Sequence, residues 1–320
     1  MVLYIIGLDT SGYTTSLAVT GEKGIALLDE RKLLDVKPGE KGLRQSEALF
    51  QHLQNIPLLI KKAGDIIPLK RTVAVAASVK PRPVEGSYMP VFRVGENFGT
   101  SFANLLNVPF YPTTHQEGHI WAALYSMGLN EDFPGRFLAL HLSGGTTELL
   151  EVSRKGVSLE IEKMGGTSDL PLGQFIDRVG VKMGLSFPCG PYLEKLARDS
   201  QDPVEIPVSV QGSQVSYSGP LTRAERLLEE GSRMEDLARG VEISAARSLV
   251  LVIKNILERT GLDRVVITGG VASNQYIKKY LQDNLRDSAP NLFFTPGELA
   301  GDNGVGVAFY GWKRFNLKNN

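Results

Sequence analysis

The same short device occurs twice in this sequence, and it constrains the possible folds more than any other feature. A β-rich run at residues 2–8 leads through a small polar turn to a second run at 16–19. Later, an apolar run at 137–142 leads through another small-residue turn to a run at 148–152. Each copy is typical of a β-hairpin, and either one alone would be an ordinary hairpin. The repetition predicts two related domains, each offering a loop of backbone N–H groups and hydroxyls suited to phosphate.

The length and charge of the chain limit the classes of protein to consider. At 320 residues it is longer than one hydrophobic core usually supports, which agrees with two domains or one duplicated unit. Lysine plus arginine and aspartate plus glutamate both total 35, so no overall positive field attracts nucleic acid. We therefore expect no DNA partner, and any RNA contact requires a local patch or a partner subunit.

Cysteine usage and hydropathy indicate the compartment. Cys189 is the single cysteine, so an internal disulfide is excluded and a reducing compartment is favoured. No stretch approaches the roughly 20 apolar residues of a membrane helix, and no basic segment precedes the first apolar run. The expectation is a cytoplasmic protein without a membrane partner.

Two of the four histidines, His115 and His119, lie four residues apart at the head of a segment of helix formers. This spacing places both imidazoles on one face of a helix, as metal ligands often are. The zinc-protease pattern needs a glutamate directly after the first histidine, but Gln116 stands there and Glu117 follows one residue later. A metallopeptidase is therefore disfavoured, and histidines that only cap a helix remain the alternative to metal binding.

Two further polar segments follow late in the chain. A predicted strand at 264–268 opens into Gly269 and Gly270, with Asn274 close behind, and a strand, a glycine pair and a helix often bring backbone close to a nucleotide. Two glycines alone also occur at many plain turns. Asp302 lies at a predicted helix start, where a carboxylate is either a cap or a ligand.

Taken in order, the three glycine-bearing loops resemble the phosphate and adenosine loops of the actin, sugar kinase and Hsp70 superfamily. With the two histidines and Asp302 added, nearly the whole chain is similar to the tRNA threonylcarbamoyladenosine transferase family, the TsaD type, formerly described as O-sialoglycoprotein endopeptidases or glycoproteases. The resemblance implies an actin-like ATPase (ribonuclease H-like) fold, an α/β fold of two duplicated domains around a cleft. The domains would span residues 1–131 and 132–320, each with a five-stranded mixed sheet. A helical insertion is expected at about 165–240, and a C-terminal helix at 304–315 can fold back on the first domain.

The resemblance also implies a set of site residues. The family's metal ligands fall on His115, His119 and Asp302, a set suited to iron or zinc. Catalytic roles fall on Asp9 and Ser11 of the first loop. The adenine nucleotide, either ATP or threonylcarbamoyl-AMP and with magnesium as a further candidate ion, would be held by Ser143, Gly144, Gly145, Thr146, Asp177, Gly190, Glu194, Gly269, Gly270 and Asn274.

The chain departs from the family pattern around the chemistry. Thr146 stands where the family has histidine, and residues 12–15 lack two acids of the family's first loop. The family's paired aspartates are reduced to Asp169, Gln174 replaces a glutamate, and only Arg44 matches an Ala-Ser-Arg-x-His segment. The main hypothesis is therefore a metal-dependent carbamoyl transferase acting on N6 of adenosine in tRNA, slower than members with full motifs. The alternative is a catalytically degenerate paralogue that binds nucleotide and regulates or scaffolds a partner. The family's related actin-like subunit and small ATPase are the implied partners.

Overall fold

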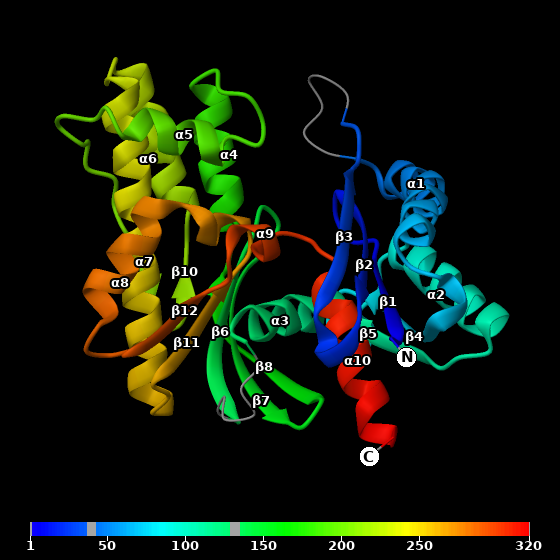
Figure 1. Cartoon of the computed structure of the whole chain (residues 1–320). Helices are drawn as coiled ribbons and strands as arrows, with labels where there is room; N and C mark the ends of the chain where they lie inside the picture. Colours follow the sequence, from blue (N-terminus) through cyan, green and yellow to red (C-terminus); the bar gives the residue numbers. More distant parts are fainter. Residues whose placement is uncertain (1, 37–42, 129–134, 320) are drawn as a thin grey trace. The chain divides into compact units, whose positions relative to one another are not determined.

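The computed structural model describes residues 2–36, 43–128 and 135–319, and these residues form two compact units. The first unit contains the described residues up to 128 together with 156–158 and 301–319, and the second contains 135–155 and 159–300. Each unit is built on a mixed β-sheet with helices, as Figure 1 shows. Within the described part of the chain, none of the helices combines the length and apolar character that crossing a membrane requires.

The first unit contains a five-stranded sheet in the order β3-β2-β1-β4-β5. The central strand β1 pairs antiparallel with β2 and parallel with β4, and β5 continues parallel to β4. This confirms the first predicted hairpin and the predicted five strands. The strands are β1 (Tyr4–Asp9), β2 (Thr14–Thr20), β3 (Ala26–Leu33), β4 (Thr72–Lys80) and β5 (Phe110–Thr114).

Helices cover both faces of this sheet because alternate residues of β1 point to opposite sides. Ile6 and Leu8 pack with residues of α1 and α2, whereas Ile5 packs with Val307 of α10. The C-terminal helix therefore belongs to the first unit, so it folds back on the first half of the chain, as the sequence analysis allowed. The helices of this unit are α1 (Gln45–Ile66), α2 (Phe92–Leu106), α3 (His115–Ser126) and α10 (Val305–Asn319), with 3-10 turns η1 (Glu22–Gly24) and η2 (Leu69–Arg71).

Two glycines let α10 approach its neighbours at backbone distance. A Cβ on Gly7 of β1 would lie 2.3 Å from the backbone nitrogen of Ala308 in α10. A Cβ on Gly306 of α10 would lie 2.0 Å from the carbonyl oxygen of Gly118 in α3. Because real Cβ atoms do not approach other atoms so closely, the packing of α10 on β1 and α3 depends on these missing side chains. That packing fixes the chain just before α10, where Asp302 lies.

The second unit repeats the strand arrangement of the first and extends it. Strand β6 pairs antiparallel with β7 and parallel with β11, and β11 pairs parallel with β12, as β1, β2, β4 and β5 do in the first unit. The predicted duplication is therefore present, but the predicted count of five strands is wrong, since the sheet has seven in the order β12-β11-β6-β7-β8-β10-β9. The two additional strands, β9 and β10, have two residues each and form a hairpin whose turn contains Gly212 at φ +59°. Strand β10 pairs with Gly166 and Thr167 of β8. The strands are β6 (Arg136–Leu142), β7 (Thr147–Lys155), β8 (Ser158–Thr167), β9 (Val210–Gln211), β10 (Gln214–Val215), β11 (Arg264–Thr268) and β12 (Asn291–Phe294).

The helices of the second unit share one core with the sheet. Leu138, Leu140 and Leu142 of β6 point into it, and α7 contributes buried residues along most of its length. Three helices lie wholly within the predicted helical insertion at about 165–240, and α7 begins there. These elements are α4 (Leu172–Lys182), α5 (Gly190–Ala197), α6 (Ser218–Glu229), α7 (Met234–Thr260), η3 (Gly270–Ser273), α8 (Gln275–Leu285) and α9 (Gly297–Ala300).

Candidate functional site

Helix α3 begins at the first histidine with a complete capping box. The side-chain oxygen of Thr114 accepts a hydrogen bond from the backbone N–H of Glu117 at 3.2 Å. The Glu117 carboxylate accepts in return from the backbone N–H of Thr114 at 2.9 Å and from the hydroxyl of Thr113 at 3.1 Å. This exchange satisfies donors at the helix start. Because it also fixes Glu117 at the cap, the glutamate is not placed as a general base beside the histidines.

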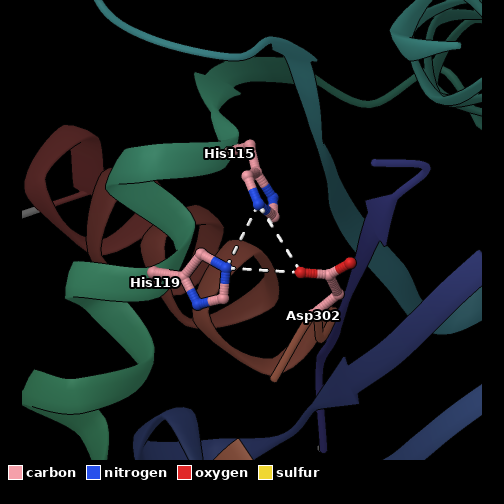
Figure 2. Close-up of side chains that lie close together, drawn as sticks. All are labelled: His115, His119 and Asp302. Atoms are coloured by element: carbon pink, nitrogen blue, oxygen red, sulfur yellow. Dashed lines mark hydrogen bonds and ion pairs between the residues drawn. The ribbon is translucent and has the colours of Figure 1, made fainter. Parts of the chain in front are cut away.

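The first turn of α3 brings His115 and His119 together with Asp302 (Figure 2). Their Nε2 atoms are 3.1 Å apart, and Asp302 Oδ1 lies 3.6 Å from Nε2 of His115 and 3.5 Å from Nε2 of His119. All three residues belong to the first unit. The sequence spacing and the packing of α10 on α3 together produce this triangle.

The triangle has the dimensions of a metal site. Three atoms at these separations lie on a circle of radius about 2.0 Å, which is the length of a zinc–nitrogen or zinc–oxygen bond. Two imidazoles and one carboxylate also suit a borderline divalent ion such as zinc or iron(II). The side chain of His119 is buried, whereas those of His115 and Asp302 remain 19% and 26% exposed, so one side of the triangle is open to exchangeable ligands. The donor set present therefore fits a divalent ion.

Asp9, at the end of β1, supports His115 from the side opposite the triangle. Its Oδ1 lies 3.3 Å from Nδ1 of His115, and Ser11 donates its hydroxyl to the other carboxylate oxygen. A carboxylate that accepts a hydrogen bond from Nδ1–H fixes the tautomer and leaves Nε2 for an ion. The structure thus places Asp9 and Ser11 behind a ligand rather than at an exposed position, since both are buried.

The charges of this cluster are strongly coupled. Burial alone would raise the pKa of Asp9, but the charge and hydrogen bond of His115 outweigh it and lower the pKa to about 2. Burial alone would lower the pKa of His115, but Asp9 raises it to about 9. Burial and the positive charge of His115 lower the pKa of His119. In the absence of an ion, His115 is therefore protonated and His119 is neutral, and binding an ion displaces a proton from Nε2 of His115.

Gly12 follows Ser11 and lies over the carboxylate of Asp302. Its φ of +50° belongs to the left-handed region, and a Cβ there would lie 2.9 Å from Oδ2 of Asp302. Glycine is the residue that accepts both conditions. The first hairpin loop therefore closes around the carboxylate that α10 delivers.

The corresponding loop of the second unit, Ser143–Thr146, connects β6 to β7. The backbone N–H of Ser143 donates to the carbonyl of Thr146 at 2.8 Å, which closes the turn. The chain leaves open space where side chains of Gly144 and Gly145 would lie. A small anion can therefore approach this backbone closely, as a phosphate-binding loop requires.

The N-terminus of α4 is attached directly to this loop. The backbone N–H of Leu172 donates to the hydroxyl of Thr147 at 2.8 Å. A Cβ on Gly173 would lie 2.6 Å from the Cα of Gly144 and from the carbonyl oxygen of Ser143, so only glycine fits there. The positive end of the α4 dipole thus lies against the loop and favours an anion.

The remaining predicted nucleotide residues lie in α4, in α5 and in the segment that leads from β11 to α8. Asp177 accepts a hydrogen bond from the backbone N–H of Cys189 at 2.8 Å and so orders the residue before Gly190. Glu194 of α5 accepts from the backbone N–H of Gln275 at 3.2 Å, next to Asn274. Gly269, at φ +100°, passes so close to β6 that a Cβ would lie 2.2 Å from the carbonyl oxygen of Leu142, whereas Gly270 has open space.

One buried acid in this region was not identified from the sequence. Glu242 of α7 accepts a hydrogen bond from the side-chain amide of Asn274 at 2.7 Å, and its other carboxylate oxygen pairs with Arg239 at 2.7 Å. Burial raises the pKa of Glu242 to about 7, against the effects of Asn274 and Arg239. The only sequence signal is an acid on the otherwise apolar face of a long helix.

One of the residues discussed as departures, Asp169, has several structural partners. Asp169 accepts hydrogen bonds from the hydroxyl of Ser216 and from the backbone N–H groups of Tyr217 and Ser218 at the start of α6. These bonds lower its pKa although burial acts in the opposite sense. In the first unit, His52 of α1 is fully buried, with Nδ1 2.8 Å from the hydroxyl of Thr15.

Comparison with known proteins gives consistent matches. A family model described as tRNA N6-adenosine threonylcarbamoyltransferase matches residues 35–309. A protein of that description from Methanopyrus kandleri is 31% identical over 316 residues, covering 96% of this chain and 86% of that protein. One from Thermus thermophilus is 30% identical, covering 98% of this chain and 93% of that protein.

The solved structure of a ROK family glucokinase from Streptomyces griseus, in complex with glucose and AMPPNP, matches 97% of this chain and 99% of its own chain. The TM-score is 0.55 at 12% identity. At that identity the likeness concerns the fold alone. It confirms the predicted actin-like fold, to which sugar kinases belong.

Proposed function

Because the chain belongs to the family of tRNA N6-adenosine threonylcarbamoyltransferases, we propose that it transfers a threonylcarbamoyl group from threonylcarbamoyl-AMP to N6 of an adenosine in tRNA. The observation that carries the proposal is the triangle of His115, His119 and Asp302, with dimensions that suit a divalent ion. A divalent ion bound there, iron or zinc, supplies Lewis acidity toward an oxygen of the reacting group.

The residues of the first unit prepare this site. His115 and His119 offer Nε2, Asp302 offers one carboxylate oxygen, and Asp9 holds the Nδ1 proton of His115. Since both histidines stand on one turn of a capped helix, their relative position changes little when an ion binds.

The residues of the second unit support adenylate binding. The loop Ser143–Thr146 and the N-terminus of α4 would hold the phosphate through backbone N–H groups. Residues of α4, of α5 and of the segment from β11 to α8 would hold the ribose and base. In this proposal the contributing residues are Asp177, Gly190, Glu194, Gly269, Gly270 and Asn274.

A transfer assay tests the proposal directly. The purified chain is incubated with threonylcarbamoyl-AMP, a tRNA transcript and zinc or iron(II), alone and with the family's related actin-like subunit and small ATPase. Modified adenosine is then quantified by nucleoside mass spectrometry. We expect metal-dependent product, and a rate at least tenfold lower in Asp302→Asn.

The matched control is Asp65→Asn, which removes an exposed carboxylate of the same unit. This variant should behave like the unaltered chain. The role of the triangle would be contradicted if Asp302→Asn, and the unaltered chain in chelator, both transferred the group as fast as the unaltered chain with metal. Nucleotide and metal binding without product in any combination would favour the binding paralogue instead.

A further inference from the structure

The segment between β4 and α2, residues 81–91, is here called the β4–α2 loop. It begins beside the metal triangle. Lys80, the last residue of β4, pairs with Thr114 of β5, which directly precedes His115. The carbonyl oxygen of Pro81 accepts a hydrogen bond from the backbone N–H of Gln116 at 3.0 Å. The first residue of the loop is thus attached to the first turn of α3.

The loop also ends beside the triangle. The carbonyl oxygen of Val91 accepts from the hydroxyl of Thr10 at 2.9 Å, and Thr10 directly follows Asp9. The ring of Phe92 lies 6.0 Å from the ring of His115 between centroids. Both ends of the loop are therefore fixed to the elements that hold the ligands, and the loop borders the metal centre.

The loop is ordered by its own chemistry. The backbone N–H of Arg82 donates to the hydroxyl of Ser87 at 3.0 Å, and the backbone N–H of Ser87 donates to the carbonyl of Val84. Gly86 turns the chain at φ +72°. Prolines at 81, 83 and 90 restrict the backbone further. The loop therefore presents its side chains in a defined arrangement.

Several side chains of this ordered loop point to solvent. The side chain of Tyr88 is 66% exposed and that of Val84 is 51% exposed. Arg82 is exposed as well, and with Lys80 it outweighs the single acid of the loop, Glu85. A largely exposed tyrosine adds little to the stability of the fold, because its ring buries little apolar area. An exposed aromatic ring on an ordered loop with basic neighbours is instead the combination that binds single-stranded nucleic acid.

We propose that the β4–α2 loop binds the RNA acceptor next to the reacting adenosine. Tyr88 stacks on a base of a single-stranded RNA loop, and Arg82 contacts the adjacent phosphate. The choice of RNA rests on the proposed function, because the acceptor in that reaction is a base in tRNA. A local basic patch of this kind is needed for RNA binding, because the zero net charge of the chain provides no general attraction for RNA.

The test measures RNA binding by the full chain separately from group transfer. The probe is a fluorescein-labelled tRNA anticodon stem-loop, where the family resemblance implies that the acceptor adenosine lies, and binding is followed by fluorescence anisotropy at low salt. We expect Tyr88→Ala to raise the Kd about tenfold, as loss of one stacked base does, and Tyr88→Phe to stay within about threefold. The control Phe50→Ala removes an aromatic ring of similar exposure, 59%, from α1 of the same unit and should leave the Kd unchanged.

A second measurement distinguishes stacking from general damage to the loop. Replacing single loop nucleotides of the probe by abasic ones should identify one position at which the unaltered protein loses about tenfold in affinity. At that position Tyr88→Ala should lose no more, because the partner of the missing base is already gone. Arg82→Gln should flatten the salt dependence of binding.

The outcomes separate this inference from the proposed function. If RNA binding depends on Tyr88 but no threonylcarbamoyl group is transferred, the inference stands and the proposed function fails. If transfer proceeds and Tyr88→Ala leaves both the Kd and the KM for tRNA unchanged, the inference is overturned. It is overturned equally if the unaltered chain binds no RNA, if the abasic and Tyr88→Ala effects add, or if Tyr88→Ala disrupts only a protein complex.

Discussion

The substitution Gly306→Ala tests whether helix packing sets the geometry of the metal triangle. The new Cβ would lie 2.0 Å from the carbonyl oxygen of Gly118 and 2.7 Å from the backbone nitrogen of Ala122. An ordinary carbon–oxygen contact needs about 3.4 Å, so α10 and α3 must separate by about 1.4 Å. Overpacking of this kind costs about 1–3 kcal/mol, and the better helix propensity of alanine returns up to about 1 kcal/mol. We expect a net loss of roughly 1–2 kcal/mol in the free energy of unfolding.

The larger effect should fall on metal binding. Asp302 precedes α10 and His119 lies in α3. Separating the two helices therefore lengthens the 3.5 Å distance between Oδ1 of Asp302 and Nε2 of His119 to about 5 Å. One ion can then no longer contact all three ligands. Misplacing a ligand in this way typically lowers metal affinity by about 10–100-fold.

Zinc affinity is measured by competition with a chromophoric chelator, and stability by denaturant unfolding in excess chelator. The matched control is Gly219→Ala in α6, where a Cβ has no atom within 4 Å, and it should change neither quantity unfavourably. If Gly306→Ala loses stability but binds zinc as tightly as the unaltered chain, the packing does not position the ligands. If it loses neither, the close approach of α10 to α3 is incorrect.

Three further outcomes are expected. Between pH 7 and 9 the zinc affinity should rise about tenfold per pH unit and then level off. The reason is that His115, with its pKa raised to about 9, is protonated below that pH and must release the Nε2 proton to bind zinc. A flat profile of zinc affinity against pH would contradict this. Asp9→Asn removes the charge that raises the pKa of His115, so burial should lower that pKa and move the pH dependence of zinc binding below pH 7. The Kd for zinc at pH 9 should increase about 10–100-fold, because the support of His115 is lost. Histidine NMR titration in chelator measures the pKa of His115, and an unchanged value would show that Asp9 is not the cause of its shift. Thr146→His restores the family's imidazole within the Ser143–Thr146 loop. It should raise the transfer rate in the nucleoside assay, since groups that act in the transition state contribute about 10²–10³ in rate. An unchanged or lower rate would show that the loss of this histidine does not limit the reaction.

The repeated hairpins were predictable because their pattern is local. Alternating β-rich runs around small-residue turns specify a hairpin within a few residues, and the structure has one at each predicted place. The pair β9 and β10 was not predictable, since two-residue strands carry no periodicity and form only because the edge of β8 is available. Local signals therefore identified the duplicated unit but not what was added to it.

The candidate site shows the same limit. The spacing of His115 and His119 predicts one helical face, which the structure has. The convergence of Asp302 depends on Gly7 and Gly306, which look like any other glycines until the packing of α10 is known. Glu242 was missed for a related reason, because the sequence does not indicate that its carboxylate meets Asn274 from another helix.

Because Asp302 lies late in the sequence, translation completes the set of metal ligands only when it reaches that residue. The two histidines leave the ribosome early, whereas the carboxylate follows about 180 residues later. At 5–20 residues per second, this delay is on the order of 10–40 s. During that interval the β-sheet of the first unit lacks the helix that covers Ile5, Ala74 and Ala76. A nascent or prematurely terminated chain can thus present two imidazoles but not the full ligand set, so acquisition of the ion reports that translation has passed residue 302.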